Sequence, residues 1–521
     1  MLYSLEWLRS GKAFPPKCET DRITRYIQNK QLFAGDHFDP ETGIDLYEQA
    51  IRRILNTCEW GDVPICYPIL LNYQKLISLK KADLVCGEEP EITGNTDAVS
   101  EALTELRQVL MFDSKLYASV IDLSRYGDVV WRMYIDENTG MADFAVWEPM
   151  SWYPIVTQDG TFRITHHVLA WKYNVGTVDN PKWRLSVQIH PIEGGYYLKR
   201  EYNMTDYGRI IGTQIGEEQR VETGFSECAV IHVASLKTSG TVFGYDDYVP
   251  VDSILCEIMT RLSQISSILD KHANPSITGP VSMLSTDPKT GEKFLKKDQF
   301  FATSPGENEP KYLTWDGKLD NAFDEIDLLL KQLYVITEMG GTILGVAEDT
   351  SQAISGTALR SKMAAPLITV RRLTNVLTYP VKRLLHAMTV AGSGREEIPV
   401  KDISIEWNDG LPTDPREDAE LAKLLTGREN LMPVAEAIVE YLHKTPAEAQ
   451  RWREQILKDS EDFNPQVTEG NSDSTATGGQ PKANGRNPEG DPEGNTKQPD
   501  VNPNKKGSNQ GLSNFHGVNN K

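Results

Sequence analysis

Residues 320–392 read DNAFDEIDLLLKQLYVITEMGGTILGVAEDTSQAISGTALRSKMAAPLITVRRLTNVLTYPVKRLLHAMTVAG. In the first part, residues 321–339, apolar side chains recur at every third or fourth position, which predicts one amphipathic helix. Asn321 is expected to cap this helix. Gly340 and Gly341 are expected to end it, because paired glycines suit the left-handed closing conformation.

A loop and a second helix follow. Residues 342–356 are small and polar, with an acidic pair at Glu348 and Asp349. The second helix is expected over residues 357–391, and it contains Pro366 and Pro380. Each proline removes a backbone N–H and crowds the preceding turn, so we expect a kinked helix.

The chain before this stretch changes its hydrophobic period once. Residues 19–32, 44–84 and 97–124 follow a helical period, and Gly127 begins a period of two. We expect the strands at residues 129–135, 144–147, 153–156, 162–170, 183–189, 195–202 and 229–234. These strands predict one mostly antiparallel sheet attached to a helical module.

After the sheet, residues 249–272 predict a long helix with Pro250 in its first turn. Residues 276–315 contain turns and strand-sized pieces, and include a small basic and aromatic group made of Lys293, Phe294, Lys296, Lys297 and Phe300. Residues 402–407 (DISIEW) predict a strand that returns to the earlier sheet. Three more helices are expected at residues 418–425, 433–442 and 446–458, and from residue 464 the composition is that of a disordered tail. The fold class is therefore α+β.

Composition limits the function. The formal net charge is −20 over 521 residues, which argues against a protein that grips nucleic acid over its whole surface. It permits a surface past which DNA slides without sticking. The six cysteines show no CxxC pair, which indicates reduced thiols, and no stretch of about twenty apolar residues predicts a membrane span. We expect a soluble protein made in the cytoplasm.

Catalytic signatures are missing from the sequence. It contains no GxxxxGK[ST], HExxH or GxSxG motif. Two acidic pairs, Asp246-Asp247 and Glu348-Asp349, are the candidates for a metal site, although solvated loop charge is the favoured interpretation. We therefore expect neither a catalytic site nor a cofactor.

The order of elements resembles that of the portal proteins of tailed double-stranded DNA bacteriophages, in the siphophage branch. Five segments carry the resemblance between about residues 45 and 460. They are the helix at 72–84 with its GEEP turn at 87–90, the YGDVVW entry to the sheet at 126–131, the FGYDDY loop at 243–248, the ANP helix end at 273–275, and residues 341–356 with TALR at 357–360.

The resemblance implies a set of parts. They would be an N-terminal arm (1–44), a wing (45–240, helices then antiparallel sheet), a first stem helix (241–274), a clip (275–319), a second stem helix (320–341), a tunnel loop (342–356), a kinked helix with a returning wing strand (357–407), a helical crown (408–463) and a disordered tail (464–521).

The resemblance also implies a function and partners. Family members form a closed homo-oligomeric ring, generally of about twelve subunits, at one capsid vertex of the virion. Double-stranded DNA passes through the ring, which meets terminase, a connector or adaptor protein, and the major capsid and scaffold proteins, with no membrane. The DNA-facing residues of the tunnel loop would be Val346, Glu348, Asp349, Thr350, Ser351 and Gln352. The partner-docking residues of the clip would be Lys293, Phe294, Lys296, Lys297 and Phe300.

Two other interpretations stay open at this point. One is a different ring-forming head or tail connector, which is disfavoured because connectors are usually shorter. The other is a nucleic-acid enzyme with a metal held by Asp246, Asp247, Glu348 or Asp349.

Overall fold

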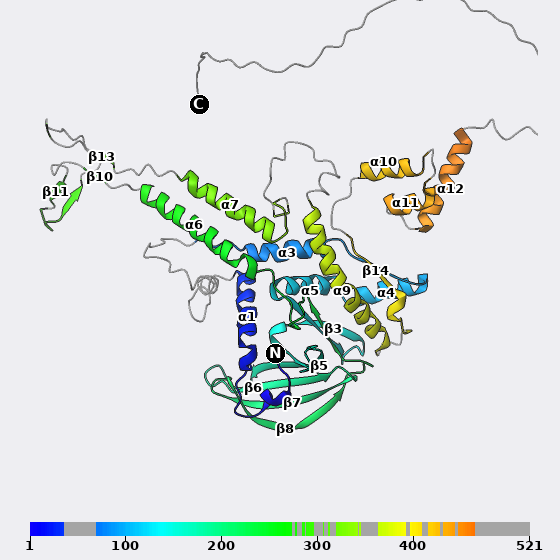
Figure 1. Ribbon diagram of the computed structural model, residues 1–521, viewed down its shortest axis with the longest axis horizontal. Helices are drawn as coiled ribbons and strands as arrows, with labels where there is room; N and C mark the ends of the chain where they lie inside the picture. Colours follow the sequence, from blue (N-terminus) through cyan, green and yellow to red (C-terminus); the bar gives the residue numbers. More distant parts are fainter. Residues whose placement is uncertain are drawn as a thin grey trace, which may run out of the picture. The chain divides into compact units, whose positions relative to one another are not determined.

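The structure is a computed structural model (Figure 1) that mixes helices with antiparallel sheets, as expected from the sequence. Its contacts divide the chain into two units, Met1–Arg428 and Glu429–Lys521. The structure describes residues 1–35, 69–273, 277–278, 284–286, 288–295, 306, 311–312, 319–341, 343–344, 363–391, 396–408, 415–427, 431–442 and 446–463.

The helices are α1 (Thr20–Ala34), α3 (Tyr73–Cys86), α4 (Asp97–Val109), α5 (Phe112–Tyr126), α6 (Val249–Ala273), α7 (Asp320–Ile336), α9 (Ala364–Val390), α10 (Pro415–Leu425), α11 (Val434–Leu442) and α12 (Pro446–Phe463). The longer strands are β2 (Asp128–Ile135), β3 (Ala142–Trp147), β4 (Trp152–Val156), β5 (Ile164–Asn174), β6 (Trp183–Pro191), β7 (Tyr196–Thr205), β8 (Ile210–Glu222) and β9 (Val230–Ala234). The short strands are β1 (Glu91–Gly94), β10 (Ile277–Thr278), β11 (Leu284–Thr286), β12 (Lys293–Leu295), β13 (Lys311–Tyr312) and β14 (Ile403–Glu406).

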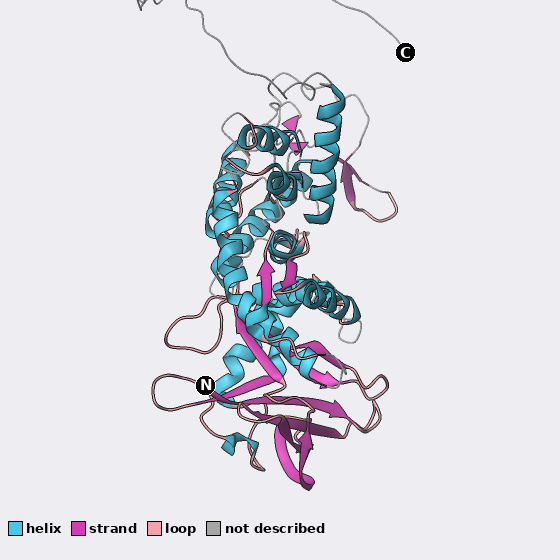
Figure 2. Ribbon diagram, turned by 90° about the vertical axis from the view of Figure 1, so that its right-hand side faces the viewer, coloured by secondary structure: helices cyan, strands magenta, loops and turns pink. Residues whose placement is uncertain are grey.

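The strands form two main sheets where the sequence predicted one. β3, β2 and β9 form a three-stranded sheet, and β4 to β8 form a five-stranded antiparallel meander. The two lie beside each other (Figure 2), and Val130, Trp152 and Leu169 are buried between them. The prediction of a single sheet was wrong because hydrophobic period identifies strands but not their pairing.

The edge strand β8 was not predicted at all. Its sequence contains Gly212 and Gly216 and a charged run around Glu217, so it lacks regular alternation. Most of its side chains are exposed, which removes the burial pattern that marks a strand.

Residues 402–407 do form a strand, but it does not return to the earlier sheet. β14 pairs antiparallel with β1 in a separate two-stranded ribbon, with Ile92 opposite Ile405. β1 has only four residues, so its periodicity was too short to read.

Residues 97–124, which were predicted to be helical, form two helices. α4 and α5 are separated by Leu110 and Met111, and Met111 has a left-handed backbone with φ 47°. Neither residue is a glycine or proline, so the sequence carries no break signal there.

The ends of α7 also differ from expectation. The residue before its first turn is Leu319, without a side-chain cap, so Asn321 lies inside the helix and does not cap it. The helix ends at Ile336, and the left-handed residue after it is Glu338 (φ 55°), not Gly340 or Gly341. A non-glycine residue in this conformation costs about 1 kcal/mol, so its side chain must be held by other contacts.

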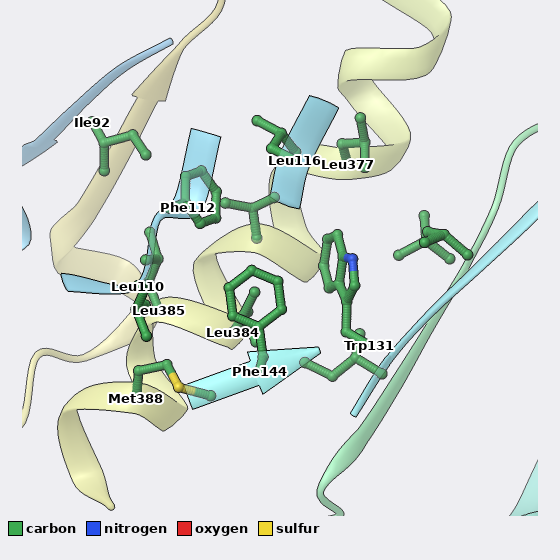
Figure 3. Packing of buried hydrophobic residues seen from close by; sticks show 14 of the residues in the cluster. Ile92, Leu110, Phe112, Leu116, Trp131, Phe144, Leu377, Leu384, Leu385 and Met388 are labelled. Atoms are coloured by element: carbon green, nitrogen blue, oxygen red, sulfur yellow. The ribbon is translucent and has the colours of Figure 1, made fainter. Parts of the chain in front are cut away.

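The largest core joins α9 to the three-stranded sheet and to α5. Figure 3 shows Trp131 and Phe144 of the sheet facing Phe112, with Leu384 and Leu385 of α9 beside them. Trp131 also donates its indole N–H to Ser119 Oγ at 2.8 Å, so its one polar atom is satisfied.

The N-terminal residues complete a second core on the five-stranded sheet. Leu2 forms a bridge with Ile155, and Ala13 forms one with Ile210. Trp7 and Phe14 are buried against the sheet between these points.

In the second unit, α11 and α12 pack together. They correspond to the helices predicted at residues 433–442 and 446–458.

A row of polar side chains is buried between the two sheets. Trp152 donates its indole N–H to His167 Nδ1 at 2.9 Å and stacks on His232. His190 lies beside Tyr197 and is 1% exposed. Burial, together with the smaller effect of the Arg132 charge, lowers the pKa of His190 to about 3.

His190→Gln should make the protein less sensitive to acid. Folded His190 stays neutral down to about pH 3, while in the unfolded chain it takes up a proton near the ordinary value of 6.5. The unfolded state then binds more protons, so the free energy of unfolding falls as pH falls, by up to about 1.4 kcal/mol per pH unit. Denaturant titrations at about pH 7.5 and about pH 5 should show that the free energy of unfolding falls less in the variant than in the wild type. His166→Gln, at a less buried site, should change this pH dependence less; equal losses in wild type and His190→Gln would contradict the prediction.

Candidate functional site

The candidate site is built on the helix pair α6–α7 and on α9, which follows it. The chain goes out along α6 and returns along α7 (Figure 1). Leu255 and Ile258 of α6 are buried in one cluster with Ile326 and Leu333 of α7. These are the residues of the predicted apolar stripes, so the two stripes bury each other in part.

An exposed ion pair spans the two helices. Arg261 of α6 lies 3.2 Å from Glu325 of α7 and 2.9 Å from Glu257 on its own helix. Pairs of this exposure contribute less than about 1 kcal/mol, so they set the register of the helices more than their stability.

The loop before α6 attaches the α6–α7 helix pair to α1, and Asp246 makes this attachment. Asp246 Oδ1 accepts the backbone N–H of Tyr248 and of Val249, both at 2.9 Å, which caps the first turn of α6. Arg25 of α1 reaches Asp246 at 3.2 Å and the buried Asp252 at 2.8 Å. Burial opposes the charge on Arg25, yet the two carboxylates raise its pKa above the ordinary value.

Asp247 makes the second attachment. Its carboxylate lies 2.7 Å from Nζ of Lys81, whose side chain is 8% exposed. It also accepts the hydroxyl of Ser124 at 2.7 Å, and its backbone N–H donates to the Ser124 carbonyl. Asp247 thus joins the loop to α3 and α5 at once.

These contacts correct the interpretation of Asp246 and Asp247. Neither is a solvated loop charge, and both carboxylates are engaged by cations, which leaves them poorly placed as metal ligands. Among the residues that the structure describes, no group of three His, Cys, Asp or Glu side chains could hold a metal ion. No local sequence pattern could have found these roles, because Lys81 and Arg25 lie far from the loop along the chain.

Two glycines let the backbone of this loop cross the end of α5. Gly127 has φ +79°, and a side chain added there would meet the backbone carbon of Gly244 at 2.6 Å. A side chain at Gly244 would in turn collide with the carbonyl oxygen of Gly127. The amide of Gly244 donates to Asp128 Oδ1 at 3.0 Å, so this crossing is also hydrogen-bonded.

The end of α7 is tied to the start of α9. Glu338 accepts from the Thr369 hydroxyl and from the guanidinium of Arg372. These bonds hold the side chain of the residue that carries the left-handed backbone. The contacts of Glu338 therefore join the residues just after α7 to the first turns of α9.

α9 contains no acidic residue, in a chain with net charge −20. Its cations are Arg371, Arg372, Lys382 and Arg383, of which Arg383 pairs with Glu227 at 2.7 Å. The basic character of this helix was not predicted, although the run without Asp or Glu is visible in the sequence.

Most of the predicted tunnel-loop and clip residues lie outside the described part of the chain. This holds for Val346, Glu348, Asp349, Thr350, Ser351, Gln352, Lys296, Lys297 and Phe300. Lys293 and Phe294 are in β12, opposite Thr286 and Ser285 of β11.

The two prolines of the expected kink have different places in α9. Pro366 lies in the first turn, where its missing N–H has no helical partner to lose, so a kink at this residue is not supported. Pro380 is in the helix interior, where the kink stays a prediction. Among the described residues, no helix is both long and apolar enough to cross a membrane.

Comparison with known proteins finds similar solved structures and a matching family. A search of curated proteins finds no match. Among solved structures, the virion of a native gene transfer agent particle is 12% identical with a TM-score of 0.43, over 83% of this chain and 95% of that chain. The neck of the same kind of particle, computed with C12 symmetry, is 13% identical with a TM-score of 0.42, over 80% of this chain and 98% of that chain.

The family comparison covers most of the chain. Residues 17–462 match the family described as phage portal protein, SPP1 Gp6-like, and this range contains α6, α7, α9 and both main sheets. The chain therefore belongs to the phage portal protein family.

Proposed function

We propose that this chain forms a ring-shaped portal at one vertex of a capsid, through which double-stranded DNA is packaged and later ejected. The observation that carries the proposal is the family match over residues 17–462. A cyclic ring needs heterologous contacts between identical copies, and a chain of this size offers distinct surfaces on its sheets and helices for them.

The parts of the portal are assigned from the order of elements. The two sheets, with α3, α4, α5 and α9, would form the wing, α6 and α7 the stem, and the segment from β10 to β13 the clip. Residues 342–356 would be the tunnel loop and residues 408–463 the crown. The stem assignment is supported by the mutual burial of α6 and α7 and by their firm attachment at Asp246 and Asp247.

The electrostatics suit passage of DNA without tight binding. The first half of α7 contains Asp320, Asp324 and Asp327, and these carboxylates would repel phosphate groups if they faced the channel. The cations of α9 follow the predicted tunnel loop, and two of them are already paired with Glu338 and Glu227. Weak attraction by the α9 cations and repulsion by the α7 carboxylates would let the DNA duplex slide through the channel.

The proposed partners and location follow from the same function. Terminase and a connector or adaptor protein would dock at the clip, near Lys293 and Phe294, and the major capsid and scaffold proteins would contact the ring from outside. The ring would assemble in the host cytoplasm and remain in the virion. The portal would be a structural protein, with ATP hydrolysis supplied by the packaging motor.

The purified protein should assemble into a ring of about twelve copies with a central channel. Native mass spectrometry gives the number of copies, and negative-stain imaging gives the symmetry and the channel. A particle that remains a compact dimer at every concentration, with or without scaffold protein, would contradict the portal proposal.

Deleting residues 345–353 should leave the rings intact but reduce packaging or retention of DNA, because this segment is proposed to line the narrowest point of the channel. The measurement is the DNA content of assembled particles, with ring formation measured in parallel. A matched control replaces the same residues by a Gly-Ser segment of equal length, which keeps the chain connection but removes the side chains. Normal DNA content in the deletion variant would show that these residues do not contact the DNA.

A further inference from the structure

A cavity of about 340 Å³ opens where α7 ends and α9 begins. Its other walls come from α3 and from the segment between β9 and α6. The apolar part of its lining consists of Ile77, Leu236, Tyr245, Pro250, Ile336, Met339 and Leu373.

The polar groups around this cavity are already paired with one another. Lys81 is bound to Asp247, and Arg372 is bound to Glu338. Asp246 is bound to Arg25. No cation lining the cavity is thus left over for a phosphate group, which disfavours DNA or a nucleotide as the occupant.

Several apolar side chains at the cavity are open to solvent. Leu236 is 55% exposed, Tyr245 53% and Ile336 43%, and they come from two separate parts of the chain. Exposed apolar side chains beside charges that are already paired are typical of a surface that contacts another protein.

We propose that this cavity receives apolar side chains of a second copy of the chain when the ring closes. The inference rests on the proposed portal function, and it names the surface by which neighbouring subunits meet. In a ring each copy presents two different surfaces, so every such cavity would be filled in the same way by the next copy. The apolar lining favours this occupant, since an apolar side chain gains from burial there without breaking any existing ion pair.

The contact would also act on the relation of α7 to α9. Ile336 and Met339 lie at the end of α7, and Leu373 lies in α9, so a side chain seated in the cavity touches both. Docking of the neighbour would then hold the end of α7 against the start of α9.

Ile336→Lys tests the proposal, with Val335→Lys as the matched control. Both side chains are on the last turn of α7, where a lysine suits the helix dipole, but only Ile336 lines the cavity. Val335 is the more exposed of the two, at 69%. Ile336→Lys should raise the concentration needed for half-assembly by at least about tenfold, and Val335→Lys should leave it near that of the wild type.

Assembly is followed by sedimentation velocity, and circular dichroism with thermal unfolding checks that each variant is folded. Ser235→Trp, on the cavity wall, supplies a second variant that blocks the space by bulk and not by charge. If the wild type forms rings and both cavity variants do so at the same concentration, the cavity proposal is overturned while the portal function stands. Equal impairment by Ile336→Lys and Val335→Lys would also overturn it, because the effect would not belong to the cavity. A wild type that never forms rings would overturn the portal function itself.

Discussion

The position of the α6–α7 pair depends on a small set of buried charges at the start of α6. Asp247 binds Lys81, and Asp246 with Asp252 binds Arg25. Each carboxylate also accepts a further hydrogen bond, from Ser124, from the α6 backbone or from Gln74. Charges this far from water stabilise a protein only when they are fully paired, and removal of one partner from a buried pair costs about 3–5 kcal/mol. The network therefore allows few other arrangements of α1, α3, α5 and α6.

The apolar side chains of the chain differ in how completely one copy buries them. The cores around α9 and the sheets are complete in one copy, with Trp131, Leu384 and Leu385 fully buried. Along α7 and at the start of α9, by contrast, Leu328 and Ile368 remain more than half exposed. Exposed apolar side chains of this kind are typical of surfaces that bind other proteins.

The sequence predicted single elements well and their pairing poorly. α1, α6 and the strands from β2 to β7 were found because their hydrophobic period is regular and their ends carry turn residues. β8 was missed because its exposed edge has no such period, and the strand at residues 403–406 was assigned to the wrong partner. The break at Met111 and the left-handed Glu338 could not be predicted, since tertiary contacts hold a residue type that does not favour the conformation. The candidate site shows the same division: charge pairs such as Lys81–Asp247 join residues 166 positions apart, a distance that no local pattern reports.

The crossing of Gly127 and Gly244 has a mechanical consequence. With 25 residues, α6 is about 37 Å long. A tilt of about 5° at its first turn would move its far end by roughly 3 Å, comparable to the length of a hydrogen bond. A small change in the angle at the first turn therefore produces a larger displacement at the far end of the helix. At Gly127 and Gly244 two backbone segments are in contact without side chains between them, which leaves little room for such a tilt. The glycine pair therefore limits where the far end of α6 lies.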